Sequence, residues 1–227
     1  MLSCPEKPEA LPRRELPFSF LTKKTPLKKR IFDLFFAGFV LFFFSPLFLL
    51  IALFVITTSK GPILYKHVRI KKGGEPFVCY KFRTMKRNSD ALLKKILSND
   101  PKKQQEWKKF FKLKKDPRIT RIGKFLRKTS LDELPQFWNV LKGDLSVVGP
   151  RPVLKQEVTE YYKDLAPKIL SVKPGLTGLW QVSGRNRLSM EERVRLEASY
   201  VDKQSIWLDL CLIAKTIPVM LFSKGAY

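Results

Sequence analysis

The sequence contains one histidine and three cysteines in 227 residues, and this scarcity excludes several kinds of site. Cys4, Cys79 and Cys211 have no paired short spacing, so neither a disulfide framework nor a zinc site is expected. A reducing cytoplasm is the setting that suits such a chain. Because His67 is the sole histidine, a triad or metal cluster built on histidine has too little material. We expect His67 to be a partly buried side chain near the end of a membrane segment.

Acidic residues are also few, with 20 Asp and Glu against 44 Lys and Arg and a formal net charge of +24. The partner is therefore expected to be strongly anionic: nucleic acid, anionic lipid headgroups or a phosphorylated substrate. The long apolar run favours lipid over nucleic acid, because a cation beside an anionic membrane surface gains about 1 kcal/mol.

This apolar run has basic residues on both sides. From Ile31 to Ile56 a helix would be about 39 Å long, enough for a hydrocarbon core of about 30 Å. Cytoplasmic flanks of membrane segments are enriched in Lys and Arg. Because both flanks of this run are basic, the sequence favours a position of both its ends on the cytoplasmic side. Pro46 removes a backbone donor and Ser45 can bond to the freed groups, which predicts a bend. We therefore predict a re-entrant helix-break-helix anchor over 28–59, with a kinked spanning helix as the alternative.

The remaining pattern predicts an α+β, mainly helical fold. Residues 1–27 are expected to form a poorly ordered arm, and 60–227 one cytoplasmic catalytic domain with a short β-hairpin and interfacial amphipathic helices. Strands are expected at 63–70, 76–82 and 145–148. Helices are expected at 90–115 with a break at 99–101, and at 122–127, 129–143, 154–164, 190–201 and 206–222, with a loop-rich stretch at 174–184. The basic helices of 90–115 lie either on an acidic membrane surface or over an ordinary core stripe.

Two adjacent acids, Asp132 and Glu133, stand at the start of a predicted helix. Ser130 and Glu133 have the spacing of a capping box, which is a purely structural explanation. Pro135 cannot donate its helical hydrogen bond, so a distorted first turn is expected. Because basic residues crowd the neighbourhood, the pair also suggests a site for phosphate and for Mg²⁺, with Asp132 and Glu133 as its carboxylate ligands.

Candidate anion-binding side chains follow from local geometry. Arg151 is held between two prolines, and a rigid guanidinium loses less entropy when it grips phosphate oxygens at two points. Lys81 and Arg83 are two positions apart at a strand end and hence on one face. Gln181 and Arg185 supply donors in a glycine-rich stretch whose backbone can approach a ligand closely. A stiff surface turn, a solvated strand end and an ordinary surface loop are the plain structural alternatives.

Five motifs occur together in one order. They are Lys-Phe-Arg-Thr-Met at 81–85, Leu-Asp-Glu-Leu-Pro-Gln at 131–136, Asn-Val-Leu-Lys-Gly-Asp at 139–144, Val-Gly-Pro-Arg-Pro at 148–152 and Pro-Gly-Leu-Thr-Gly at 174–178. In this combination the chain resembles the bacterial sugar transferases, the small monotopic phosphoglycosyl transferases that begin polyprenol-linked glycans. The likeness runs from about Lys28 to Phe222. The Ser45-Pro46 break resembles the re-entrant anchor of that family.

The resemblance implies transfer of a sugar 1-phosphate from a UDP-sugar to undecaprenyl phosphate, with Mg²⁺ required. It implies that Asp132 is the nucleophile, that Glu133 holds the metal or orients Asp132, and that cationic side chains neutralise phosphate charge. The candidates for that last role are Lys81, Arg83, Arg151 and Arg185. The product would start an exopolysaccharide, capsule, O-antigen or glycoprotein glycan, and the sequence does not identify the sugar.

The resemblance also implies a place in the cell and a set of partners. The expected site is the inner membrane, with the catalytic domain on its cytoplasmic face, anionic lipids and downstream glycosyltransferases as partners, and no nucleic acid. The additional N-terminal membrane region of larger family members is lacking here, which implies the minimal form. Two other functions stay open at this point: a membrane-anchored basic module that binds anionic lipid or nucleic acid without catalysis, and an inactive scaffold.

Overall fold

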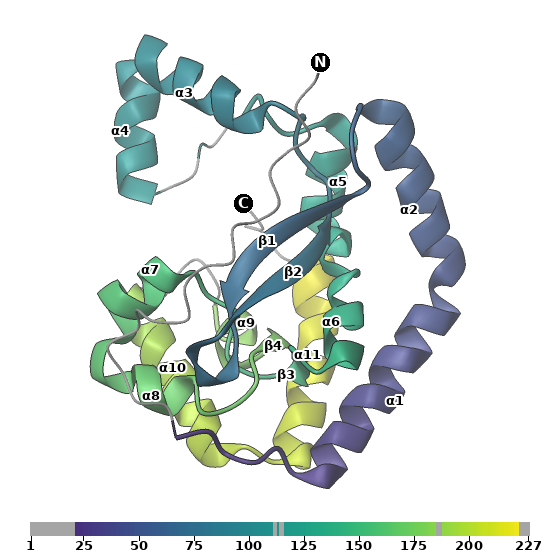
Figure 1. The fold of residues 1–227 in the computed structure, drawn as a ribbon, viewed down its shortest axis with the longest axis vertical. Helices are drawn as coiled ribbons and strands as arrows, with labels where there is room; N and C mark the ends of the chain where they lie inside the picture. The colour runs from purple at the N-terminus through teal and green to yellow at the C-terminus, as the bar shows by residue number, and fades with distance from the viewer. Residues whose placement is uncertain (1–20, 111–112, 114–115, 185–187, 223–227) are drawn as a thin grey trace.

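The computed structural model describes residues 21–110, 113, 116–184 and 188–222, so most of the expected arm over 1–27 lies outside the described residues. Two small two-stranded sheets are surrounded by helices (Figure 1). The helices are α1 Leu27–Phe43, α2 Ser45–Thr58, α3 Ser89–Asn99, α4 Pro101–Phe110, α5 Arg121–Thr129, α6 Gln136–Lys142, α7 Lys155–Glu157, α8 Ala166–Ile169, α9 Leu179–Val182, α10 Met190–Lys203 and α11 Ile206–Phe222. The strands are β1 Leu64–Ile70, β2 Pro76–Phe82, β3 Ser146–Val148 and β4 Gly175–Thr177. The short 3-10 helices are η1 Lys72–Gly74, η2 Leu131–Glu133 and η4 Lys163–Leu165, and η3 Val158–Tyr162 is a π-helix.

The expected anchor forms two helices, α1 and α2, bent by 61° at the predicted break. The hydroxyl of Ser45 donates to the carbonyl of Phe42 at 2.8 Å, which satisfies one of the groups that the break frees. Among the described residues no single helix is long and apolar enough to cross a bilayer, whereas α1 and α2 together are. That geometry is shared by a re-entrant loop and by a broken span.

Polar side chains attach α1 to the rest of the molecule. Lys29 is buried and donates to the carbonyl of Val148 at 3.1 Å and to Asp209 of α11 at 2.6 Å. Asp33, one helical turn further on, accepts a hydrogen bond from the backbone of Val147 at 3.0 Å. The start of α1 is therefore fixed against β3 and α11, while α2 packs on α5.

The predicted hairpin is confirmed. β1 and β2 pair antiparallel from Ile70 opposite Pro76 outward. Asn139 of α6 forms hydrogen bonds with backbone groups on the free edge of β2. Its amide nitrogen donates to the carbonyl of Val78 at 2.7 Å, and its oxygen accepts from the backbone of Tyr80 at 3.1 Å. These two hydrogen bonds fix the position of the hairpin relative to α6.

The expected continuous helix over 129–143 is wrong. Ser130 ends α5 in the left-handed conformation, with φ 58°, and forms no side-chain cap, so the predicted capping box with Glu133 is absent. The acids form the separate turn η2, and α6 begins only after Pro135. A proline without an N–H is well placed at a helix start, which explains why the two pieces stay separate. The expected helix over 154–164 is likewise divided, into α7, η3 and η4.

The stretch expected to be loop-rich, 174–184, contains β4 and α9. β4 pairs in parallel with β3, and the backbone at the ends of these strands packs very closely. A Cβ on Gly175 would lie 2.0 Å from the backbone nitrogen of Gly149, and one on Gly178 would lie 2.2 Å from its carbonyl oxygen. These two glycines therefore admit a neighbouring stretch of backbone, and Gly175 also lines the pocket described below.

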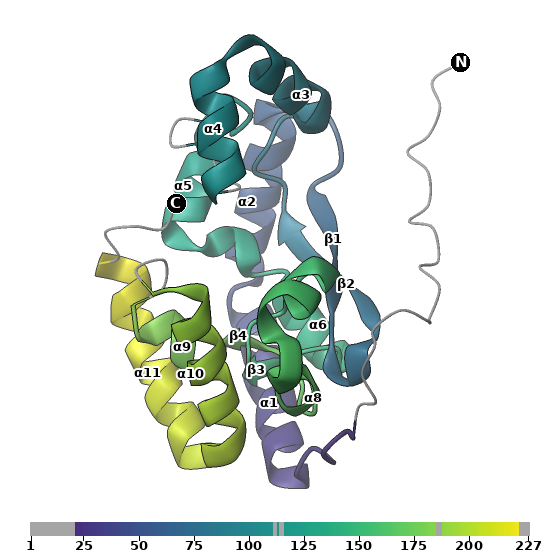
Figure 2. The ribbon, with the colours of Figure 1, turned by 90° about the vertical axis from the view of Figure 1, so that its left-hand side faces the viewer.

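The two basic helices α3 and α4 form as predicted, with the break near Pro101. They project from the top of the molecule, and α3 buries none of its residues (Figure 2). In Figure 1, α4 lies on the side away from the bend between α1 and α2. A position of α4 on the same bilayer surface as the anchor stays a prediction, and this arrangement does not favour it.

Candidate active site

The two acids lie on η2, between α5 and α6, against the end of the hairpin. Asp132 is 8 % exposed, and Glu133 is more open. Lys81 of β2 donates to Glu133, with 2.6 Å between Nζ and Oε1. Because the left-handed residue Ser130 redirects the chain immediately before η2, the two carboxylates enter the body of the domain beside β2.

The neighbouring acids have opposite pKa shifts. Burial, reinforced by the charge of Glu133, raises the pKa of Asp132 to about 6, although Lys81 and Arg127 oppose this. Burial also acts to raise the pKa of Glu133, but Lys81 and Arg151 outweigh it and hold that pKa at about 2. Asp132 is thus a carboxylate more basic than an exposed aspartate that is still mainly ionised at neutral pH. Such a group is suited to nucleophilic attack.

A small pocket with an internal volume of about 10 Å³ adjoins Glu133. Four residues predicted from the sequence contribute to it: Lys81, Glu133, Arg151 and Gln181. Arg69 of β1 supplies a further cation to its wall. A small cavity with three cations and one carboxylate has an excess of positive charge, which suits a phosphorylated ligand.

The proline-framed Arg151 is fixed on both sides of its backbone and beneath its side chain. Its guanidinium carbon lies 5.4 Å from the ring centroid of Trp180, a cation–π contact that orients the charge. The guanidinium is therefore presented to the pocket from a rigid support, as the two prolines predict.

The sequence matches the family described as bacterial sugar transferase over residues 24–223.

The chain belongs to the bacterial sugar transferase family.

Relatives with assigned names share much of this sequence. The undecaprenyl-phosphate galactose phosphotransferase of Salmonella typhimurium is 48 % identical over 199 residues, which are 88 % of this chain and 41 % of that protein. The UDP-galactose-lipid carrier transferase of Erwinia amylovora matches to the same extent, again over 41 % of its length. The exopolysaccharide production protein ExoY of Rhizobium meliloti is 46 % identical over 88 % of both chains. The chain thus spans less than half of the first two relatives and most of the third.

Among the described residues, two predicted site residues of this bacterial sugar transferase, Asp132 and Arg83, do not line the pocket, although Asp132 is next to Glu133 in the sequence. Arg83 is buried elsewhere and donates to backbone carbonyls of Val55, Ser59 and Pro62 at the end of α2. Its position gives no support to a role in phosphate binding. Arg185 lies outside the described residues.

Sequence reasoning missed Arg69 and Gln136, which also line the pocket. The signal for Arg69 was present in the hairpin register. Arg69 pairs with Phe77, and alternation places Phe77, Cys79 and Lys81 on one face, so Arg69 shares the face of Lys81. Gln136 follows Pro135 at the first position of α6, and only the break of the helix turns it toward the pocket.

The acid pair fits the chemistry of a magnesium site. Among the described residues there is no group of three or more His, Cys, Asp or Glu side chains placed to hold a metal ion. Mg²⁺ is commonly bound through one or two carboxylates with substrate phosphates and water completing its shell. Within the described part of the chain Asp132 accepts no hydrogen bond from another side chain, and it is nearly buried without lining the pocket. By ligand type, the pair fits Mg²⁺ bound together with a phosphorylated substrate.

Proposed function

We propose that this chain transfers a sugar 1-phosphate from a UDP-sugar to undecaprenyl phosphate, through a phosphosugar intermediate on Asp132. The observation that carries the proposal is the nearly buried Asp132, whose pKa is raised, directly before Glu133, which lines a pocket together with three cations. The names of the Salmonella and Rhizobium relatives agree with this class of reaction and with exopolysaccharide synthesis.

In the first step a carboxylate oxygen of Asp132 attacks the phosphorus that bears the sugar. An oxygen–phosphorus bond forms, and the bond from that phosphorus to the bridging oxygen of the diphosphate breaks. UMP leaves with the bonding electron pair and takes up a proton from water. Lys81, Arg69 and Arg151 lie where they can offset the negative charge that accumulates on the phosphate oxygens.

In the second step a phosphate oxygen of undecaprenyl phosphate attacks the same phosphorus. The bond to Asp132 breaks, the carboxylate is restored, and the product is an undecaprenyl diphosphate sugar. A covalent intermediate lets one site serve a soluble donor and a membrane-bound acceptor in turn. Since the donor is a soluble nucleotide sugar, we place the domain on the cytoplasmic face of the inner membrane.

Asp132 and Glu133 would hold Mg²⁺, which when bound supplies further positive charge to the donor phosphates. Glu133 is already paired with Lys81 at 2.6 Å, so this lysine fixes the second carboxylate whether or not a metal is present. We expect chelation with EDTA to stop UMP release and added Mg²⁺ to restore it. UMP release that is unchanged in EDTA would contradict the metal requirement.

The test of the mechanism is Asp132→Asn, which keeps the shape of the side chain but removes the nucleophilic charge. We expect loss of UMP release to below about one part in a thousand of the wild-type rate, with folding and membrane attachment intact. Asp164→Asn, at an exposed position, is the matched control and is expected to turn over normally.

A donor labelled in its sugar identifies the intermediate. Wild-type protein, a panel of UDP-sugars and Mg²⁺ without acceptor are expected to yield UMP and one labelled phosphosugar per chain, bound at Asp132. The same panel names the sugar. Kinetics that require both substrates before any UMP appears would sink the two-step mechanism, and tight salt-sensitive DNA binding without UMP release would favour the basic module instead.

A further inference from the structure

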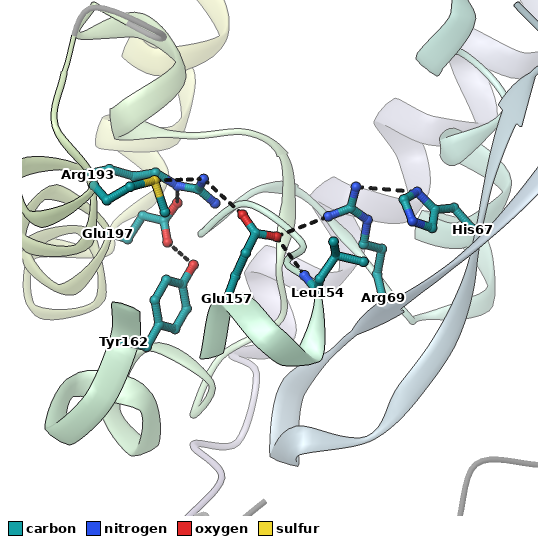
Figure 3. Close-up of polar contacts among 8 residues, drawn as sticks. His67, Arg69, Leu154, Glu157, Tyr162, Arg193 and Glu197 are labelled. Atoms are coloured by element: carbon teal, nitrogen blue, oxygen red, sulfur yellow. Dashed lines mark hydrogen bonds and ion pairs between the residues drawn. The ribbon is translucent and has the colours of Figure 1, made fainter. Parts of the chain in front are cut away.

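A continuous set of ion pairs joins the pocket to α10 (Figure 3). Arg69 of β1 donates to one oxygen of Glu157 at 3.3 Å, and Arg193 donates to the other oxygen at 3.3 Å. Arg193 also donates through Nε to Glu197 at 3.1 Å, and the hydroxyl of Tyr162 donates to the same Glu197. Glu157 thus stands between a guanidinium of the hairpin and one of α10.

Arg69 is the member of this network that reaches the pocket. A second amino group of its guanidinium lies 3.3 Å from Nδ1 of His67. Arg69 and Arg151 line the same small pocket, so two like charges face one space, and burial and then the charge of Arg151 lower the pKa of Arg69. The acids nearby are Glu133, already bonded to Lys81, and Glu157, already shared with Arg193. An anion in the pocket would relieve the repulsion between these like charges.

The same network fixes the second pocket guanidinium. Trp180 lies under both Arg151 and Arg193, whose guanidinium carbons are 5.4 Å and 4.6 Å from the ring centroid. Arg193 also donates to Glu157 and to Glu197. The ring that orients Arg151 therefore contacts the arginine that holds Glu157, and through Glu157 it is linked to Arg69.

We propose that Arg69 contacts the diphosphate of the nucleotide-sugar donor and that Glu157 is the residue that positions it. This inference rests on the proposed function. A guanidinium has five N–H donors in a rigid fork. Glu157 and His67 engage two of its nitrogens, which leaves donors for phosphate oxygens while holding the plane of the group in place. A lysine could not be held in this way.

Binding of UDP to the full chain in detergent micelles, measured by calorimetry, tests the role of Arg69. We expect Arg69→Gln to weaken UDP binding about 10- to 100-fold, the loss typical of a charge-assisted contact. Arg69→Lys, which preserves the charge and is the safer variant for folding, is expected to recover only part of the affinity. Uridine, which has no phosphate, should bind all variants equally. Arg195→Gln, at an exposed position on α10, is the matched control.

Glu157→Gln separates positioning from simple electrostatics, because the two roles predict opposite signs. Removal of a negative charge near the pocket would by itself strengthen binding of an anion. If Glu157 positions Arg69, its removal weakens UDP binding. In a chain that already carries Arg69→Gln, the same removal should then have little further effect. We expect weaker UDP binding in the single variant, no further loss in the double variant, and a raised KM for the UDP-sugar with an unchanged KM for undecaprenyl phosphate.

The results for UDP binding and UMP release distinguish failure of the inference from failure of the proposed function. If wild-type protein binds UDP and releases UMP while Arg69→Gln and Arg69→Lys bind UDP as wild type does, Arg69 is structural and the inference fails while the proposed function stands. If wild-type protein neither binds UDP nor releases UMP from any UDP-sugar, the proposed function fails, and the inference with it. Tighter UDP binding in Glu157→Gln would overturn the positioning role alone.

Discussion

Lys81 and Arg83 stand two residues apart near the end of β2 but serve different parts of the molecule. Lys81 bonds to Glu133 in the pocket. Arg83 donates hydrogen bonds to carbonyl groups at the end of α2. Gly61, with φ 129°, allows the chain to turn around this guanidinium. The last carbonyls of a helix lack partners within the helix, so a buried arginine there is a C-terminal cap for the anchor.

At the residue scale we therefore expect Arg83→Gln to lower stability and to spare substrate binding. The shorter amide cannot reach several carbonyls, and the loss of charge-assisted hydrogen bonds should cost about 2 kcal/mol in thermal unfolding. The KM for the UDP-sugar should not change. Arg87→Gln, at an exposed position, provides the comparison. A raised KM with unchanged stability would instead support the phosphate-binding role that the sequence suggested for Arg83.

At the scale of elements, both ends of the bent anchor are attached to one body. Before α1, the backbone of Lys23 donates to Ser171, and its carbonyl accepts from Lys72 beyond α2 and β1. After α2, Arg83 holds the helix end. Flanks that touch one another cannot lie on opposite faces of a hydrocarbon core about 30 Å thick. This connection favours the re-entrant loop over the broken span.

Labelling from one side of a sealed membrane tests that topology. Lys24→Cys and Lys72→Cys would be placed singly in a chain whose Cys4 and Cys211 are replaced by serine, since Cys79 is buried. We expect an impermeant thiol reagent to reach both positions in inside-out vesicles and neither in right-side-out ones. Labelling of the two positions from opposite faces would establish a spanning anchor.

At the scale of the whole molecule, one buried ion pair joins the beginning of the described fold to its end. Lys29 of α1 and Asp209 of α11 are 2.6 Å apart and nearly unexposed, and the hydroxyl of Tyr200 donates to the other oxygen of Asp209 at 2.7 Å. The pair lies beside β3, whose terminal carbonyl on Val148 accepts from Lys29 and lies 3.1 Å from the Tyr200 hydroxyl. Anchor, sheet and last helix are thus held at one point.

Removal of one partner should cost more than removal of both. We expect Lys29→Met to lower stability by about 3–5 kcal/mol, because it leaves Asp209 charged, buried and without its cation. The double variant with Asp209→Leu should recover much of this loss, and Lys28→Met, at an exposed position, should have little effect. Thermal unfolding in detergent measures all three. A double variant as unstable as the sum of the single ones would contradict this account.

Local pattern was enough for much of this protein. Period-two alternation and a glycine turn predicted the hairpin, the Ser45-Pro46 pair predicted the bend in the anchor, and apolar periodicity predicted α10 and α11. The acid pair and the proline-framed Arg151 also stood out, because their unusual surroundings are neighbours in the sequence.

Only the tertiary structure decided which of these groups meet. The partner of Lys81 is 52 residues away and that of Arg69 is 88 away, and no local pattern encodes contacts at such separations. The same holds for η2, because the left-handed turn at Ser130 and the late start of α6 are held by packing against β2, whereas local propensity predicts a single helix. Composition and periodicity determine which elements form; the free energy of burying their faces together determines which charges share a pocket.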